Sequence, residues 1–385
     1  MIKLANKKDC CGCNACAQRC PKSCITMQAD SEGFLYPQIN AQLCNNCGLC
    51  EKVCPVINQD NCRKPLKVYA AINKNEDIRI ASSSGGVFSA FAQKTLSNGG
   101  VVFGAAFNKE WGVEHIYIDS IEELKELRGS KYVQSNIGNT YKEAEKFLKQ
   151  GREVLFSGTP CQIAALKLFL RKEYDNLTTL DIVCHGAPSP KVWKKYLIEN
   201  CKELGIESTK KIKSIKFRDK VTGWKRYSIS YITDNDINGE KYTYRPLDED
   251  IFMQCFLSDL CLRPSCYNCP ARNGKSGSDI TLADLWGATE ICPELDDDKG
   301  LSLVLVRNED KSIPTFIYKE IDYNIALKHN MAIKKDFSIP HNRNKFFSLM
   351  EREGVTRATM KYLPKKKGPN LWSKLLWNIK HRIFK

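Results

Sequence analysis

Short apolar runs alternate with longer amphipathic segments through the middle of the chain. Four runs are mostly apolar and too short for helices, and they predict buried strands at 68–72, 101–104, 154–156 and 180–183. Four longer segments space their apolar residues as helices do, at 87–97, 139–150, 162–172 and 190–203. This alternation predicts an α/β domain with a mixed, largely parallel sheet.

The first sixty residues follow a different pattern. Two short stretches, 25–27 and 33–37, predict the strands of a hairpin in a segment too small for a core of its own. With 385 residues the chain is longer than a usual single domain. We therefore expect a small domain at 1–62, a larger one at 66–345 and a tail at 346–385.

The composition is that of a globular protein. Hydrophobic residues make up 42% of the chain and charged residues 27%, which argues against disorder. The net charge of +15 is concentrated at the C-terminus, where the last 21 residues hold seven Lys or Arg and no acid. Because no zinc-finger spacing or RNP-type motif accompanies this charge, we expect no nucleic-acid partner.

The sequence shows no sign of export or of a membrane span. No apolar run approaches the ~20 residues that cross a bilayer, and the first fifteen residues carry charges and cysteines where a signal peptide is apolar. We therefore expect a cytoplasmic protein. In that reducing compartment the 19 cysteines are expected to bind metal rather than to form disulfides.

Two identical cysteine patterns, C-x2-C-x2-C-x3-C-P, begin 34 residues apart, at Cys10 and at Cys44. This is the pattern of two-cluster bacterial ferredoxins, in which the fourth cysteine of each run ligates the other cluster. We therefore expect two [4Fe-4S] clusters in an α+β ferredoxin-like domain, one held by Cys10, Cys13, Cys16 and Cys54 and one by Cys44, Cys47, Cys50 and Cys20. Zinc is less expected, because structural zinc sites use separated C-x2-C pairs. Cys11, Cys24 and Cys62 fall outside the pattern and are expected to pack as small residues.

The turn before the helix predicted at 87–97 reads Ser82-Ser83-Ser84-Gly85-Gly86. A serine–glycine turn at a helix N-terminus presents free amides and a favourable dipole to a phosphate. The same residues also serve as an ordinary cap and turn. The residues alone leave both interpretations open.

Cysteines also follow two of the predicted strands. Cys161 comes after 153–157, Cys184 comes after 178–183, and Cys261, Cys266 and Cys269 cluster further along the chain. Ligands of α/β folds gather at the carboxyl ends of strands. A third metal site made of Cys161, Cys184, Cys266 and Cys269 is one interpretation, and buried free thiols are the other.

Six different motifs follow one another along the larger domain: Ser84–Gly86, Gly129–Gln134, Gly158–Gln162, Cys184–Gly186, Phe217–Lys220 with Gly223-Trp224, and Arg263–Cys269. Together with the closing stretch Ser278–Gly287 they resemble the family of coenzyme F420 hydrogenase/dehydrogenase beta subunits. The resemblance covers residues from about 66 to about 310. It is more specific than any one of these motifs.

The resemblance implies a flavin enzyme that holds FAD beside a [4Fe-4S] cluster and exchanges hydride with coenzyme F420 or another small substrate. It makes Cys161, Cys184, Cys266 and Cys269 the expected ligands of a third cluster, with Cys261 as a substitute. The residues that it assigns to the flavin and its phosphates are Ser84, Gly85, Gly86, Lys131, Tyr132, Gln134 and Thr159. For Arg218 it leaves two interpretations, a contact with a cofactor anion and a salt bridge to an acid.

The C-terminal tail predicts a basic amphipathic helix after Gly368-Pro369-Asn370, with Leu371, Leu375, Ile379 and Ile383 on one stripe. Such a helix with tryptophans can lie on an anionic membrane surface, which would give peripheral contact with the inner membrane. Docking on its own domain is the other interpretation.

The sequence thus predicts a flavin-dependent iron–sulfur oxidoreductase that passes electrons between [4Fe-4S] clusters, FAD and a hydride donor or acceptor. Its expected partner is a redox protein or a small molecule that gives or takes hydride. The alternative is an electron-transfer module that serves a partner enzyme and has no substrate chemistry of its own. No side-chain acid or base is singled out as catalytic.

Overall fold

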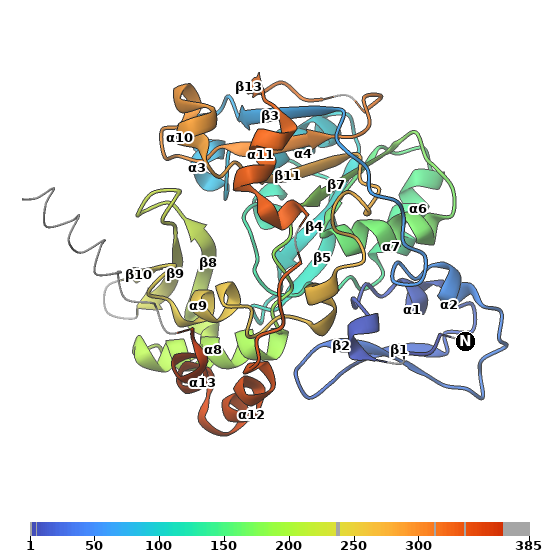
Figure 1. The fold of residues 1–385 in the computed structure, drawn as a ribbon, viewed down its shortest axis with the longest axis horizontal. Coiled ribbons are helices and arrows are strands. Elements are labelled where there is room, and N and C mark those ends of the chain that lie inside the picture. The colour runs from blue at the N-terminus through green and yellow to red at the C-terminus, as the bar shows by residue number, and fades with distance from the viewer. Residues whose placement is uncertain (1, 5, 236–238, 312, 335, 365–385) are drawn as a thin grey trace, which may run out of the picture.

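The computed structural model describes residues 2–4, 6–235, 239–311, 313–334 and 336–364. The chain forms an N-terminal hairpin segment, an eight-stranded sheet covered by helices and a separate three-stranded sheet (Figure 1). The tail helix predicted from Leu371 onward lies outside the described residues.

The N-terminal segment contains one antiparallel hairpin. Strands β1 (Ile25–Ala29) and β2 (Leu35–Ile39) pair as the sequence predicts, and the helices α1 (Ala15–Arg19) and α2 (Leu49–Lys52) lie within the two cysteine runs. Phe34 of the hairpin is fully buried in the core of the three-stranded sheet. The segment therefore completes its apolar cover by packing against the rest of the chain, as its small size requires.

The larger sheet has the strand order β13-β3-β12-β11-β7-β6-β4-β5. Its strands are β3 (Lys67–Ile72), β4 (Val101–Phe107), β5 (Val113–Ile118), β6 (Val154–Gly158), β7 (Leu177–Ile182), β11 (Ile280–Asp284), β12 (Ser302–Val306) and β13 (Ile317–Glu320). The central strands β11, β7, β6 and β4 pair in parallel, and the flanking pairs are antiparallel. Five of the eight strands, β3, β4, β6, β7 and β11, run in one direction, so the prediction of a mixed, largely parallel sheet is confirmed.

Helices cover both faces of this sheet. Val101 and Phe103 of β4 pack with α6 (Thr140–Lys149) and α7 (Pro160–Leu170), whereas Val102 packs with α4 (Val87–Ser97) on the opposite face. Neighbouring side chains of a strand point to opposite faces. Burial on both faces explains why these strands are apolar throughout instead of alternating with polar residues.

The smaller sheet was not predicted from the sequence. It has the order β10-β9-β8, all antiparallel, with β8 (Ile212–Asp219), β9 (Ser228–Asn235) and β10 (Gly239–Pro246). Its core also includes residues of α8 (Pro190–Glu203), α9 (Ile251–Leu257), α12 (Arg343–Glu353) and α13 (Val355–Tyr362). The tail boundary expected at residue 346 therefore falls inside α12, where Phe346 is fully buried.

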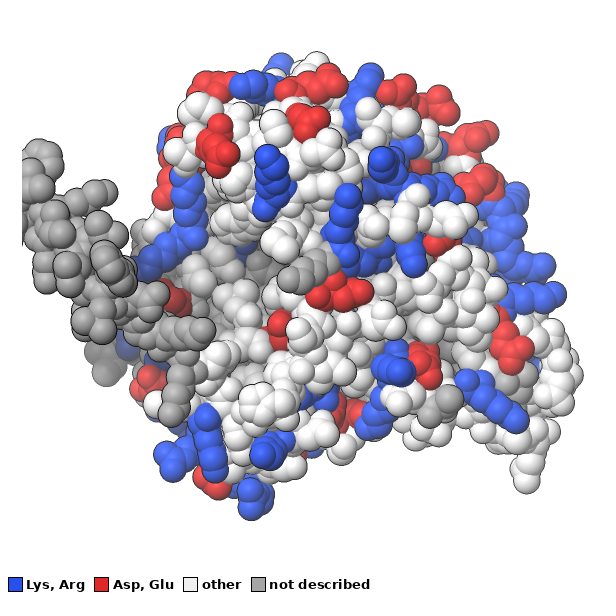
Figure 2. Space-filling model, in the orientation of Figure 1, with Lys and Arg blue, Asp and Glu red and all other residues white. Residues whose placement is uncertain are grey.

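The remaining elements are short. They are the helices α3 (Glu76–Ala81), α5 (Leu124–Leu127), α10 (Ala288–Ile291) and α11 (Tyr323–His329) and the 3-10 turns η1 (Lys7–Asp9), η2 (Thr209–Lys211), η3 (Pro264–Asn268), η4 (Pro293–Leu295) and η5 (Met331–Ile333). Within the described ranges, no helix combines the length and the apolar character that crossing a bilayer requires. Basic and acidic side chains are interspersed over the face that Figure 2 shows.

Candidate functional site

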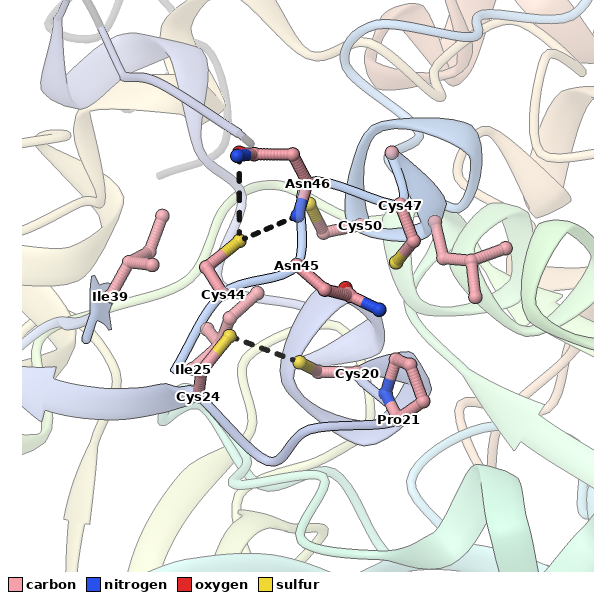
Figure 3. A pocket seen from close by; sticks show the side chains of 12 residues that line it. Cys20, Pro21, Cys24, Ile25, Ile39, Cys44, Asn45, Asn46, Cys47 and Cys50 are labelled. Carbon is pink, nitrogen blue, oxygen red and sulfur yellow. Dashed lines mark hydrogen bonds between the residues drawn. The ribbon is translucent and has the colours of Figure 1, made fainter. Parts of the chain in front are cut away.

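The second cysteine run surrounds one pocket together with a cysteine of the first run (Figure 3). The pocket is lined by all four cysteines expected to share a cluster, Cys20, Cys44, Cys47 and Cys50. Two sulfurs accept backbone N–H groups: Asn46 donates to Cys44 Sγ at 3.4 Å and Ile2 donates to Cys50 Sγ at 3.3 Å. Donors of this kind favour the charged thiolate form that a cluster needs.

The first cysteine run gathers around the last cysteine of the second run. Burial raises the pKa of the Cys16 thiol to about 12, and the nearby Cys10 and Cys54 act on it in the same direction. The pKa of Cys54 is raised by burial and then by Cys10 and Cys50. Cys54 therefore lies with Cys10 and Cys16, in the crossed arrangement expected from the spacing, and it also lies beside the second set.

These thiols fit a metal cluster by their chemistry. Burial and mutual repulsion both oppose their ionisation, so the thiolates need a nearby positive charge, which iron supplies. Among the described residues, no three His, Cys, Asp or Glu side chains converge closely enough to hold a single metal ion. The four cysteines around a cubane lie further apart than the ligands of a single ion, because each cysteine ligates its own iron.

The third set of cysteines comes from three separate segments. Cys161 lies in the first turn of α7, Cys184 follows β7, and Cys266 and Cys269 lie in and after η3. Burial raises the pKa of Cys184 well above its usual value, and Cys266, Cys161 and Cys269 each raise it further. The four cysteines proposed to form a third site are thus mutual neighbours.

Cys261, the substitute for a ligand of this third set, lies elsewhere. It is fully buried and interacts with Cys255, another fully buried thiol. The sulfur of Cys266 accepts the N–H of Ala187 at 3.3 Å, and that of Cys161 lies 3.3 Å from Thr159 Oγ1. The structure therefore groups Cys266, not Cys261, with the third set.

Cys11 and Cys24 have more specific positions than the packing roles expected for them. Cys24 Sγ lies 3.3 Å from Cys20 Sγ in the pocket of the second set. The buried Cys11 thiol interacts with Cys13 of the first set and with Cys161 of the third. The spacing gave no sign of either contact, because Cys11 and Cys24 lie outside the repeated pattern.

The serine–glycine loop before α4 is tied to the sheet. Ser84 Oγ donates to Leu301 O at 3.0 Å, and Gly85 N–H donates to Ser302 Oγ at 3.0 Å. A Cβ on residue 85 would lie 2.4 Å from Ala71 O, so this glycine is required for close packing against β3. Gly86, with φ at +80°, caps α4. The hydroxyl of Ser84 and the amide of Gly85 are therefore engaged within the protein.

The same loop contacts the segment that carries Lys131 and Tyr132. Ser130 N–H donates to Ser83 Oγ at 2.7 Å. Burial lowers the pKa of the Lys131 ammonium to about 7, and this ammonium donates to the carbonyls of Arg128 and Gly129. Two of the motifs in the family resemblance, distant in sequence, thus lie side by side.

Gln134 and Thr159 lie closer to the cysteines than the other residues assigned to the flavin. The amide nitrogen of Gln134 donates to Cys11 O at 3.1 Å. Thr159 caps α7 through a reciprocal pair of hydrogen bonds with Gln162, next to Cys161. Thr159 therefore lies at the edge of the third cysteine set, and Gln134 lies against the first cysteine loop.

Arg218 lies at the end of β8 among aromatic rings. Its guanidinium pairs with Asp284 at 2.7 Å, which agrees with the salt-bridge interpretation, and lies 3.8 Å from the centroid of the Tyr227 ring. Its Nη1 also donates to Tyr132 Oη at 3.4 Å. Nε and Nη2, however, are buried without a hydrogen-bond partner within the described part of the chain, although the side chain is only 4% exposed.

Unpartnered N–H groups on a buried guanidinium are unusual, because each loses its water without a replacement. The surrounding rings include Trp286, which stacks on Trp224 with the two planes 7° apart. Such a group of planar rings and free donors suits a flat ring system that carries hydrogen-bond acceptors. A flavin fits that description.

Aromatic contacts connect this region to the third cysteine set. The ring of His185, the residue after Cys184, lies 4.9 Å from that of Phe256. Phe256 in turn lies 4.9 Å from the ring of Tyr132. The four regions therefore follow one another through the protein: second set, first set, third set and the aromatic group around Arg218.

Three family models match the chain. The 4Fe-4S dicluster domain matches residues 9–58, so this segment defines an iron–sulfur protein. The N-terminal model of the coenzyme F420 hydrogenase/dehydrogenase beta subunit matches residues 68–141, and the C-terminal model matches residues 151–312. The chain belongs to the family of coenzyme F420 hydrogenase/dehydrogenase beta subunits, as the sequence motifs predicted.

Individual relatives match parts of the chain. An F(420)H(2) dehydrogenase component of Methanosarcina mazei is 28% identical over 168 residues, which cover 41% of this chain and 48% of the relative. The ferredoxin-type protein NapF of Escherichia coli strain K12 is 41% identical over 44 residues, 11% of this chain and 27% of the relative. The chain thus spans about half the length, or less, of the curated relatives that it matches.

A solved structure of the F420-reducing [NiFe] hydrogenase complex of Methanosarcina barkeri contains a chain with a weaker likeness. The match covers 78% of this chain and 91% of that one, with 15% identity and a TM-score of 0.43. A likeness of this degree does not define a fold.

Proposed function

We propose that the chain is a flavin-dependent oxidoreductase that passes electrons between a hydride donor or acceptor and a redox partner protein, through FAD and three [4Fe-4S] clusters. The supporting observation is the succession of four sites: Cys47 of the second set is exposed, and the aromatic group around Arg218 lies at the opposite end. Electrons enter or leave as hydride at one end and singly at the other.

The cofactors supply the redox chemistry: a flavin exchanges two electrons as hydride, and cubane clusters carry one electron at a time. The protein's contribution is to hold them in order and to exclude water. The first and third sets share the buried Cys11 as a neighbour, and Cys54 of the first set lies beside Cys50 of the second. Short separations of this kind are what single-electron transfer needs.

The proposal for the hydride partner is supported by the family and not by the geometry of the site. Members of the family are described by coenzyme F420, and a matched relative is a component of an F(420)H(2) dehydrogenase. We therefore propose reduced coenzyme F420 as the first donor to test. Because the second set is at the surface, we place the contact with a redox partner protein beside Cys47.

The second candidate function is an electron-transfer module that serves a partner enzyme and binds no flavin. The match of the first 58 residues to a dicluster domain would suit it equally. It leaves unexplained, however, the two free donors of Arg218 among aromatic rings.

A bleaching experiment tests the proposal. The oxidised, anaerobically purified protein is offered reduced coenzyme F420, NADH, NADPH and reduced ferredoxin in turn, while the flavin and cluster absorption is followed. We expect one hydride donor to bleach both chromophores. If reduced ferredoxin bleaches the clusters and no hydride donor does, the flavin enzyme is excluded and the electron-transfer module is the supported function.

A ligand variant sharpens this test. In Cys161→Ser the hydride donor should still bleach the flavin but should reduce the N-terminal clusters much more slowly, since the third set would lose a ligand. Cys62→Ser is the matched control: Cys62 is exposed and lies outside all three sets. Equal cluster reduction in both variants would contradict a path through the third set.

A further inference from the structure

Arg263 connects the first cysteine set to the third from a fully buried position. Its Nε donates to Cys10 O at 2.7 Å, and its Nη2 donates to Leu35 O at 2.9 Å and reaches Cys10 Sγ at 3.5 Å. Its Nη1 donates to Gln134 Oε1 at 3.1 Å. The guanidinium is thus fixed by its full fork of donors, and one of them faces a thiol of the first set.

The backbone of the same residue belongs to the surroundings of the third set. Arg263 N–H donates to Ala187 O at 2.9 Å, and Arg263 O accepts the N–H of Cys266 at 2.9 Å. The positive charge of Arg263 also acts to lower the pKa of two thiols of the third set. It opposes the contact with Cys11 and the burial that raise the pKa of Cys161, and the burial that raises the pKa of Cys266. One buried cation therefore acts on thiols of two sets that come from opposite ends of the sequence.

The first cysteine loop is shaped around this side chain. Gly12 adopts φ of +72°, and a Cβ on it would lie 2.7 Å from Arg263 Nη1 and 2.9 Å from Arg263 Cζ. Only glycine lets the loop pass over the guanidinium. The close approach keeps the charge within reach of the loop that carries Cys10.

Among the described residues, no carboxylate pairs with Arg263, although a buried charge without a partner is strongly disfavoured. Arg343, the other buried arginine beside the hairpin, differs in this respect: it holds Glu32 through two hydrogen bonds of 2.9 and 2.6 Å. The rings of Tyr36 and Phe34, at 4.3 and 5.5 Å, give Arg263 only partial compensation. Within the described ranges, the polar contacts of its side chain are therefore two backbone carbonyls, one amide oxygen and Cys10 Sγ.

We propose that Arg263 is a positioning residue whose charge compensates the first [4Fe-4S] cluster and raises its reduction potential. This inference rests on the proposed function, because it assumes that Cys10 is a cluster ligand. Each electron that the first cluster gains from a neighbouring cluster adds one negative charge, and the guanidinium stabilises that charge through Cys10 Sγ. Loss of the guanidinium makes the reduced form less favourable.

Potentiometric titration of the purified holoprotein, followed by electron paramagnetic resonance, tests this role. Arg263→Gln should lower the midpoint potential of one cluster, with about a tenfold weaker reduction equilibrium, about 59 mV for one electron. The other two clusters should shift less. Arg263→Lys keeps a charge but loses the fork of donors, so its midpoint potential should lie between those of Arg263→Gln and wild type.

Arg343→Gln is the matched control, since it removes a buried arginine from the same interface without touching a thiol. It should leave all three potentials at their wild-type values, even if it lowers thermal stability. If Arg263→Gln loses iron, Arg263→His decides, because its charge can be removed by raising the pH through the imidazole pKa of about 6.5. A midpoint potential that falls over this range, where wild type shows no such fall, supports the inference, and a potential with the wild-type pH dependence refutes it. Equal potentials in Arg263→Gln and wild type likewise refute it, whereas wild-type protein that binds no iron refutes the proposed function instead.

Discussion

The two unpartnered donors of Arg218 predict a strong effect on flavin binding when this arginine becomes glutamine. In Arg218→Gln the fork and its charge are lost, and Asp284 keeps the indole N–H of Trp224, at 3.1 Å, as a donor. Nε and Nη2 are the groups that the described part of the folded chain leaves without a partner. We therefore expect the loss to appear when the ligand binds.

The size of the effect follows from the number of donors. A hydrogen bond involving a charged group contributes about 1.5–3 kcal/mol. Losing two of them at the lower value removes about 3 kcal/mol, which weakens binding by about a hundredfold, since about 1.4 kcal/mol corresponds to a factor of ten. The glutamine amide can replace one donor, so a tenfold loss is the lower bound of the expectation.

Titration of FAD into deflavinated protein, followed by quenching of flavin fluorescence, measures this loss. Arg226→Gln is the matched control, because Arg226 lies in the same part of the chain but is exposed and pairs with Asp248 and Glu249. It should bind FAD like wild type. Circular dichroism and thermal melting must show that Arg218→Gln is folded. A folded Arg218→Gln protein with wild-type affinity would show that the guanidinium does not face the flavin.

Three further predictions follow from the same geometry. Crossed ligation predicts that Cys54→Ser and Cys10→Ser perturb the same electron paramagnetic resonance signal. Cys20→Ser should perturb the signal of the other N-terminal cluster. If Cys20→Ser instead perturbed the signal that Cys10→Ser perturbs, crossed ligation would be contradicted. Gly85→Ala should lower stability by about 1–3 kcal/mol, since its Cβ would meet backbone, and an unchanged melting temperature would argue against this packing. Burial lowers the pKa of Lys131 in the folded chain to about 7. Between about pH 7 and about pH 10 the unfolded chain therefore holds a proton on this lysine that the folded chain has lost, so stability should rise over this range. Lys131→Met should flatten that rise in denaturant titrations, and an equally steep rise would refute the assignment.

The sequence predicted best those features that rest on strict spacing or strict burial. Helices at 87–97 and 190–203 are found with those bounds, because each buries one apolar face against a sheet. The crossed ligation of Cys54 with the first run stays a prediction of the repeat, whose spacing fits few other structures, and Cys54 lies beside Cys10 and Cys16 as that ligation requires.

Features that depend on distant contacts were not predictable in this way. The sheet β8–β10 shares its core with helices α12 and α13 from the far end of the chain, which no local pattern reveals. The sequence left Gly85 open between a phosphate contact and an ordinary turn, and only the fold shows that its missing side chain makes room for β3. Arg263 is one residue of a cysteine motif in the sequence, and only the fold brings it to Cys10.

The cofactor content of the protein tests the central claim most directly. Iron, acid-labile sulfide and flavin are to be measured in the full-length chain after anaerobic purification. Three cubanes and one flavin predict about twelve irons, about twelve sulfides and one FAD per chain. About eight irons with no flavin would contradict the account and leave only the two N-terminal clusters.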